Sequence, residues 1–213
     1  MDKEILNDDN YKSEEITSDL WREIFDTKDQ QKRVEKTINL WKKYCKEELR
    51  NTILCLEDNL LSIEFIKSEK GVGVLYEIKL KNGETTYFEG LLPQEEYETE
   101  AWDKYPVSLK NFYCNLHNGF TEFNTSCGIV PVQSIDKLCD YDWEIIDDLN
   151  LEVRISLDNS YMIFTSGGGG YIVIDITSNK EDDATIWFSN KAPKYNANLW
   201  DFLDEWILIL LGY

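Results

Sequence analysis

Hydrophobic residues in the first 45 positions recur with the period of an α-helix. Ser18 is a candidate N-cap for a helix that contains Trp21 and Phe25. A second apolar stripe has the i, i+4, i+7, i+11 spacing of one helix face and consists of Val34, Ile38, Trp41 and Cys45. The pattern therefore predicts two amphipathic helices at the start of the chain.

The period changes to two after residue 60. Apolar and polar residues alternate within 61–65, 74–80 and 86–88, as in strands with one buried face. Asn82-Gly83 favours a tight type I′ turn between the last two of these segments. We expect an antiparallel meander, followed by an acidic connector at 93–104 (PQEEYETEAWDK).

Short helices and strands are mixed in the second half. Pro106 is placed to open a helix, and Asn118-Gly119 to close it. The buried stripe of this helix is predicted to be Leu109, Phe112, Tyr113 and Leu116. Ser134 is a candidate cap of a further helix, whose core-facing residues would be Ile135, Leu138, Cys139 and Ile146.

The remaining elements follow the same two patterns. Strands are predicted at 151–157, 161–165, 171–176 and 184–188, and Asn198 is expected to cap a last helix that reaches Leu210. Helices at both ends and in the middle, with hairpins between them, indicate an α+β fold. We expect a single twisted sheet, antiparallel or mixed, that is flanked by helices.

The composition indicates the size of domain and the cellular compartment to expect. With 213 residues, 42% of them hydrophobic, the chain can form one large domain or a domain with an extension. No 18-residue apolar run predicts a membrane span, and MDKEILNDDN lacks the apolar core of a secretory signal, so we expect a cytoplasmic protein. The five scattered cysteines, Cys45, Cys55, Cys114, Cys127 and Cys139, are then expected to be reduced core thiols.

The formal net charge of −19 excludes some partners and favours others. Residues 91–160 carry 14 acidic and 4 basic side chains, which is over half of the excess. Binding of nucleic acid or of an anionic membrane needs lysine and arginine, so neither is expected. Such a charge favours a basic protein partner, although it can also serve solubility alone.

Candidate catalytic motifs are weak. In YMIFTSGGGGYIVIDIT (161–177) no lysine follows the glycines, and a strand rather than a helix comes next, so a phosphate-binding loop is not predicted. The glycines are expected to form a hairpin turn. The lone histidine, His117, lacks the partners of a catalytic triad, and no metal or cofactor is predicted. A glycosidase-like carboxylate pair cannot be picked out from 41 acidic residues.

Four segments occur in an order that resembles the SUKH superfamily. They are YPVSLKNFYCNLHNGF, GIVPVQSIDKL, YMIFTSGGGGYIVIDIT and LWDFLDEWI. The resemblance covers about Leu92 to Gly212. It implies a SUKH-like domain at 91–213, and residues 1–90 then form an N-terminal extension of helices and a β-meander packed on it. This superfamily includes a yeast cell-wall-synthesis regulator and many bacterial immunity proteins, so the resemblance implies a non-enzymatic protein.

The acidic middle of the chain and the resemblance indicate the same function. An immunity protein neutralises a cognate toxin, often a nuclease with a basic surface, inside the producing cell. The alternatives are a cytoplasmic regulatory adaptor and a small carboxylate-site enzyme such as a glycan hydrolase. The predicted partner-binding residues are Glu95, Glu96, Glu98, Glu100, Trp102, Asp103, Asp140, Tyr141, Asp142, Trp143, Asp147, Asp148, Gly168 and Gly169, with Tyr97 as a further interleaved aromatic.

Aromatic residues amid charges are typical of an interface centre with a charged rim, although Tyr141 and Trp143 can equally be core residues. Four glycines exceed the one or two that a tight hairpin needs, which favours a pliable loop that admits a partner's backbone. On this interpretation, changing Gly168 and Gly169 together to valine leaves the fold largely intact.

Overall fold

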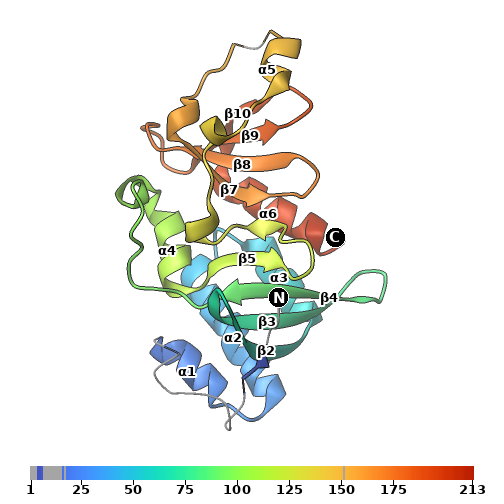
Figure 1. The fold of residues 1–213 in the computed structure, drawn as a ribbon. Coiled ribbons are helices and arrows are strands. Elements are labelled where there is room, and N and C mark those ends of the chain that lie inside the picture. The colour runs from blue at the N-terminus through green and yellow to red at the C-terminus, as the bar shows by residue number, and fades with distance from the viewer. Residues whose placement is uncertain (1–3, 7–15, 17, 151) are drawn as a thin grey trace.

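The computed structural model describes residues 4–6, 16, 18–150 and 152–213 (Figure 1). Over these residues the fold is α+β, with six α-helices around one open ten-stranded sheet. Each strand pairs antiparallel with the next strand in the sequence, so the sheet is a continuous meander from β1 to β10. The expectation of an α+β fold with one antiparallel sheet is confirmed.

The elements have the following bounds. The strands are β1 (Glu4–Ile5), β2 (Leu60–Ser68), β3 (Gly71–Lys79), β4 (Thr85–Leu91), β5 (Asn118–Glu122), β6 (Gly128–Ile129), β7 (Ser160–Thr165), β8 (Gly170–Asp175), β9 (Asp183–Phe188) and β10 (Lys194–Asn198). The α-helices are α1 (Asp19–Phe25), α2 (Gln30–Cys45), α3 (Arg50–Asn59), α4 (Val107–Asn115), α5 (Glu144–Asp148) and α6 (Leu199–Leu210).

Helices α1, α2 and α6 agree with their predictions. The Ser18 hydroxyl accepts a hydrogen bond from the Trp21 amide and caps α1. The Asn198 side chain accepts from the amides of Trp200 and Asp201 and caps α6. In α2 the predicted stripe faces the core, with Trp41 fully buried. Each of these helices carries its own local signal, which is why the sequence pattern is sufficient to find it.

Helix α3 has no such signal and is not predicted. Its N-cap residue, Leu49, makes no side-chain cap. The carboxylate of Asp204, on α6, supplies the missing acceptor: one oxygen lies 2.7 Å from the Thr52 amide and the other 2.9 Å from the Asn51 amide. Asp204 is only 5% exposed. A cap that comes from about 150 residues away cannot be read from local sequence.

The β2–β4 meander is confirmed, but its second turn differs from the prediction. Only Gly83 in this turn has a positive φ, of 88°, whereas a type I′ turn also needs one at Asn82. The Gly83 amide donates to the Leu80 carbonyl at 2.9 Å, and the Leu80 amide donates to the Glu84 carbonyl at 2.7 Å. The connection is therefore a three-residue loop that ends on a left-handed glycine.

Helix α4 begins after Pro106 as predicted, and its stripe of Leu109, Phe112 and Tyr113 is buried. Its predicted end is wrong. The helix stops at Asn115, and Asn118 and Gly119 begin β5. Gly119 has a φ of 86°, and a Cβ there would lie 2.6 Å from the Pro131 nitrogen. The glycine is thus needed for the close approach of two chain segments rather than for helix termination.

The helix predicted from Ser134 and the strand predicted at 151–157 do not form. Leu151 lies outside the described residues, and no strand is assigned at 152–157. Residues 132–148 instead contain two 3₁₀ turns and the short α5. Between these turns Lys137 bridges to Tyr161, and the Met162 amide donates to the Asp136 carbonyl at 2.9 Å. Pairing with β7 keeps this backbone extended, which overrides the helical pattern.

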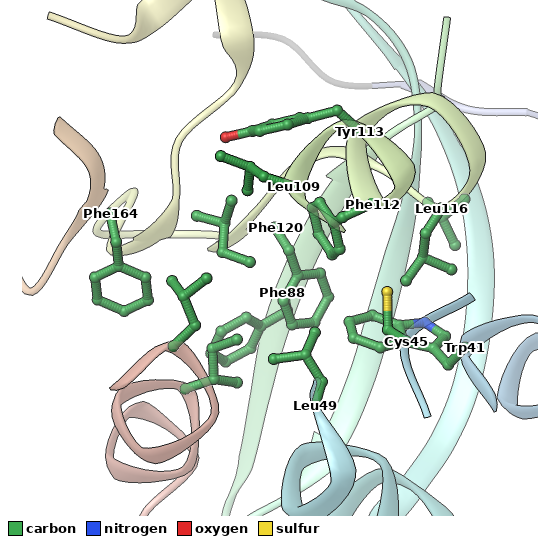
Figure 2. Packing of buried hydrophobic residues seen from close by; sticks show 14 of the residues in the cluster. Trp41, Cys45, Leu49, Phe88, Leu109, Phe112, Tyr113, Leu116, Phe120 and Phe164 are labelled. Carbon is green, nitrogen blue, oxygen red and sulfur yellow. The ribbon is translucent and has the colours of Figure 1, made fainter. Parts of the chain in front are cut away.

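Two hydrophobic clusters hold the sheet. The larger lies between the sheet and the helices, and Figure 2 shows Trp41, Phe88, Phe112 and Phe120 packed within it. The smaller lies on the opposite face of β7–β9 and consists of Leu138, Trp143, Ile145, Met162, Val173 and Trp187. The alternating residues Val153, Ile155 and Leu157 pack on this second cluster, so their period-two pattern reflects burial without strand pairing.

The predicted boundary at residue 90 lies inside β4, which pairs with β5. The Trp21 indole also donates to the Leu116 carbonyl at 3.0 Å. The described parts of 1–90 therefore share both a sheet and a core with the rest. All five cysteines are free thiols, but Cys114 is half-buried and Cys139 is exposed, so the expectation that all five are core residues is wrong.

Candidate functional site

The first predicted acidic segment, 93–104, lies on the surface and is anchored by aromatic residues. The Tyr97 hydroxyl donates to the Tyr113 carbonyl at 2.9 Å, and its ring packs against Trp102 at 4.8 Å. Tyr97 is buried and Trp102 is half-buried. The carboxylates around these anchors are all exposed: Glu95, Glu96, Glu98, Glu100 and Asp103. The anchors hold the backbone, so the charges are presented on an ordered segment.

The second acidic segment, 136–148, is anchored in the same way. Trp143 is 9% exposed, its indole donates to the Leu138 carbonyl at 2.7 Å, and its ring lies 5.5 Å from that of Trp187. Trp143 is thus a core residue, which was the alternative left open by the sequence. Asp140, Asp142, Asp147 and Asp148 are exposed. Asp140 also accepts from the Lys137 amide at 2.8 Å.

An ion pair joins the two segments. Lys137 Nζ lies 3.3 Å from a Glu100 carboxylate oxygen and 5.4 Å from the centre of the Tyr161 ring. Tyr161 and Glu100 both raise the pKa of Lys137, so it stays protonated. Exposed ion pairs contribute little to stability. The contact nevertheless shows that the two segments meet at Glu100 and Lys137, and we refer to both together as the acidic surface.

Tyr141 is the most exposed of the four aromatic residues singled out from the sequence. Its side chain is 48% exposed, and its hydroxyl donates to an Asp136 carboxylate oxygen at 2.6 Å. The hydrogen bond to Asp136 raises the pKa of Tyr141 to about 12. Asp136 itself was not among the predicted site residues. Its proximity to Tyr141 follows from the extended path of 135–141, for which the local pattern carries no signal.

The glycine run is a hairpin turn between β7 and β8, as predicted, and a side chain holds its backbone. Ser166 Oγ accepts from the amides of Gly168 and Gly170 and fixes the turn. Gly169 has a φ of 77°, and a Cβ there would collide with Ser189 Oγ. The expectation that valine is tolerated at both Gly168 and Gly169 is therefore wrong. Only Gly168 combines an ordinary φ with open space.

His117 belongs to a buried hydrogen-bond chain that the sequence did not predict. The Trp41 indole donates to the Tyr76 hydroxyl at 3.0 Å, and that hydroxyl lies 2.5 Å from His117 Nε2. His117 Nδ1 lies 3.1 Å from the Leu91 carbonyl, which can only accept, so Nδ1 carries the proton and Nε2 accepts from Tyr76. Burial lowers the pKa of His117 to about 3. A neutral, enclosed imidazole of this kind is a structural group.

The described residues contain neither a metal-binding cluster nor a membrane-spanning helix. Within them, no group of three or more histidine, cysteine, aspartate or glutamate side chains is arranged to hold a metal ion. None of the helices seen in these ranges has the length and apolarity needed to cross a membrane. Comparison of the chain with family models, with curated proteins and with solved structures finds no significant match in any of the three.

Proposed function

We propose that this chain is a SUKH-like immunity protein of the cytoplasm, which binds a basic cognate toxin and neutralises it. A nuclease is the toxin class that fits best. The observation that carries the proposal is the acidic surface: nine exposed carboxylates predicted from the sequence lie on two anchored segments, joined by the Glu100–Lys137 ion pair. The order of the four resembling segments supports the same assignment.

The mechanism follows from electrostatics. A nuclease binds its polyanionic substrate through lysine and arginine, and a surface rich in carboxylates competes for those groups. Charge complementarity of this kind raises the association rate, and salt weakens it. Buried anchors such as Tyr97 and Trp143 hold the backbone of both segments, so little backbone entropy is lost on binding.

The test is co-expression with a candidate toxin domain taken from a neighbouring gene. The informative variant reverses the charge of four carboxylates from both segments: Glu96, Glu98, Asp142 and Asp148, each changed to lysine. We expect this variant to lose its protection of cells in a growth assay. Its remaining affinity for the toxin should no longer fall as the salt concentration rises. Structural integrity is checked by circular dichroism.

A matched control carries the same charge change elsewhere, with Asp26, Glu35, Glu47 and Asp58 changed to lysine. All four are exposed and belong to the first 90 residues. This variant should still protect cells. Equal loss of protection in both variants would show that only net charge matters and would refute a localised interface. Full protection by the first variant would refute the acidic surface itself.

A further inference from the structure

A pocket of about 330 Å³ opens on the sheet where β5 to β8 meet the segment 130–141. Thr121, Thr165 and Tyr171 line it, and they are next in sequence to Phe120, Phe164 and Ile172 of the main core. Because neighbouring side chains of a strand point to opposite faces, the pocket lies on the face away from that core. The volume is at the small end of the ~300–1,000 Å³ typical of ligand pockets.

The polar wall of the pocket is held in place. The Asp136 carbonyl accepts from the Met162 amide at 2.9 Å, and the Asp136 carboxylate accepts from the Tyr141 hydroxyl at 2.6 Å. A carboxylate offers about four acceptor positions, so this one bond leaves capacity for a ligand. The raised pKa of Tyr141 means that the phenol remains a hydrogen-bond donor at neutral pH.

Two tyrosine rings and a thioether form the less polar part. Tyr141 is exposed, Tyr171 is half-buried, and Met162 is buried beside them. The Tyr171 ring packs at 5.7 Å from Trp143, which fixes its position. Tyrosine faces attract cations, and most strongly where water is excluded. The lining therefore combines a fixed carboxylate with rigid aromatic surfaces.

Acidic residues lie near the pocket as well as in its lining. Glu89 lies opposite Thr121 in the β4–β5 register, on the same face, and exposed Asp140 follows Asp136 by four residues. Of the described residues that line the pocket, Lys70 is the one cation. It is exposed at the turn between β2 and β3. The lining itself pairs one carboxylate with one ammonium group, so it is Asp136, placed beside the tyrosine rings, that favours a cationic ligand.

We propose that this pocket receives an arginine side chain of the protein partner. The planar guanidinium forms a forked pair of hydrogen bonds with the Asp136 carboxylate and stacks on the tyrosine faces. A lysine ammonium matches the carboxylate but not the flat aromatic walls. The assignment to a protein partner rests on the proposed function, and the pocket then supplies the anchor within a wider acidic surface.

Met162 provides a direct test. The chain has two methionines, Met1 and Met162. With ¹³C-methyl-methionine labelling, NMR therefore shows two signals, and the variant Met162→Leu identifies the one that comes from the pocket. The probe is the peptide acetyl-Gly-Arg-Gly-amide, and its neutral control replaces arginine by citrulline. We expect the Met162 signal to shift saturably with the arginine peptide, and the citrulline peptide to bind about tenfold more weakly, since a charge-assisted hydrogen bond is lost.

Variants then assign the contact. Asp136→Asn should weaken binding of the arginine peptide about tenfold, as one charged hydrogen-bond acceptor becomes neutral. Asp148→Asn, an exposed change in the acidic surface outside the pocket, should leave it unchanged. Because Asp136→Asn could disturb 135–141, Lys70→Gln serves as an independent variant and should tighten binding. Equal binding of both peptides, or no effect of Asp136→Asn and Lys70→Gln, would overturn the inference.

The test separates this inference from the proposed function. If the arginine peptide binds the pocket but the chain protects no cell from a co-expressed candidate toxin, the pocket stands and the immunity role fails. If reversal of the acidic surface abolishes protection while Asp136→Asn neither weakens the peptide nor reduces protection, the immunity role stands and the arginine pocket fails.

Discussion

The two ends of the sheet are built on different principles. Around β3 and β4 the core contains the hydrogen-bond chain of Trp41, Tyr76 and His117, in which the polar groups of all three side chains are paired. On the outer face of β7–β9 the cover is irregular chain packed through Trp143 and Trp187. The Trp187 indole nitrogen is buried there without a hydrogen-bond partner among the described residues.

This difference indicates which end is scaffold and which is working surface. Fully paired polar groups in a core favour one arrangement of side chains over others. Among its described residues, the outer cover of β7–β9 has no buried side-chain chain of this kind, and it carries the second acidic segment and the Asp136 pocket. We therefore expect the β2–β4 end to dominate stability, and changes in the outer cover to alter binding more than folding.

The largest effect should come from removing one tryptophan from each end. Trp41→Ala deletes a fully buried side chain and leaves Tyr76 without its donor, so we expect a loss of about 4 kcal/mol in the free energy of unfolding. Trp143→Ala should cost about 3 kcal/mol, at the low end for a buried tryptophan, since its site lies near the surface and can relax. Urea unfolding measures both. Equal losses would contradict the distinction between scaffold and cover.

Asp204 links the two ends, because it lies on α6 and caps α3. Asp204→Ala leaves the amides of Asn51 and Thr52 without their acceptor, and we expect a loss of about 3 kcal/mol. The control is Asp201→Ala in the first turn of the same helix, which is exposed and should cost about 0.5 kcal/mol. If calorimetry gave the same melting temperature for both variants, the remote cap would be unimportant.

Acid should weaken the scaffold through His117. The unfolded chain takes up a proton on this residue near its ordinary pKa of 6.5, whereas the folded protein does not until about pH 3. Stability from this residue is complete above pH 6.5 and falls by about 1.4 kcal/mol per pH unit below it, or about 2 kcal/mol at pH 5. His117→Gln removes the titration, so its stability should fall less steeply between pH 6.5 and 5. Parallel plots of unfolding free energy against pH for the two proteins would show that His117 does not cause the loss of stability in acid.

The smallest predicted effect distinguishes two adjacent glycines of the β7–β8 turn. Gly169→Ala forces a side chain into a left-handed conformation against Ser189, and we expect a loss of about 1–2 kcal/mol. Gly168→Ala has ordinary backbone geometry and open space, so it should stay within about 0.5 kcal/mol of the parent. Thermal unfolding of the pair is the measurement. A reversal of their order would mean that the turn adopts another conformation in solution.

Local patterns predicted the elements whose signals lie within their own residues. Helix α6 has its cap at Asn198, and β7 and β8 have their alternation and their glycine turn. The exposure of Glu98 or Asp142 followed from charge alone. The burial of Tyr97 and Trp143 did not, because an aromatic residue between carboxylates has the same local pattern whether it anchors the chain or contacts a partner.

What the sequence determined by itself was the fold class, the order of most helices and strands, and the excess of negative charge in the middle of the chain. Tertiary structure decided the start of α3, the path of 132–148, the pairing of Asp136 with Tyr141 and the burial of His117. The reason is physical. Periodicity and caps act over a few residues, whereas a buried polar group takes whichever partner the fold brings near, and for Asp204 and Tyr76 those partners lie far away in the sequence.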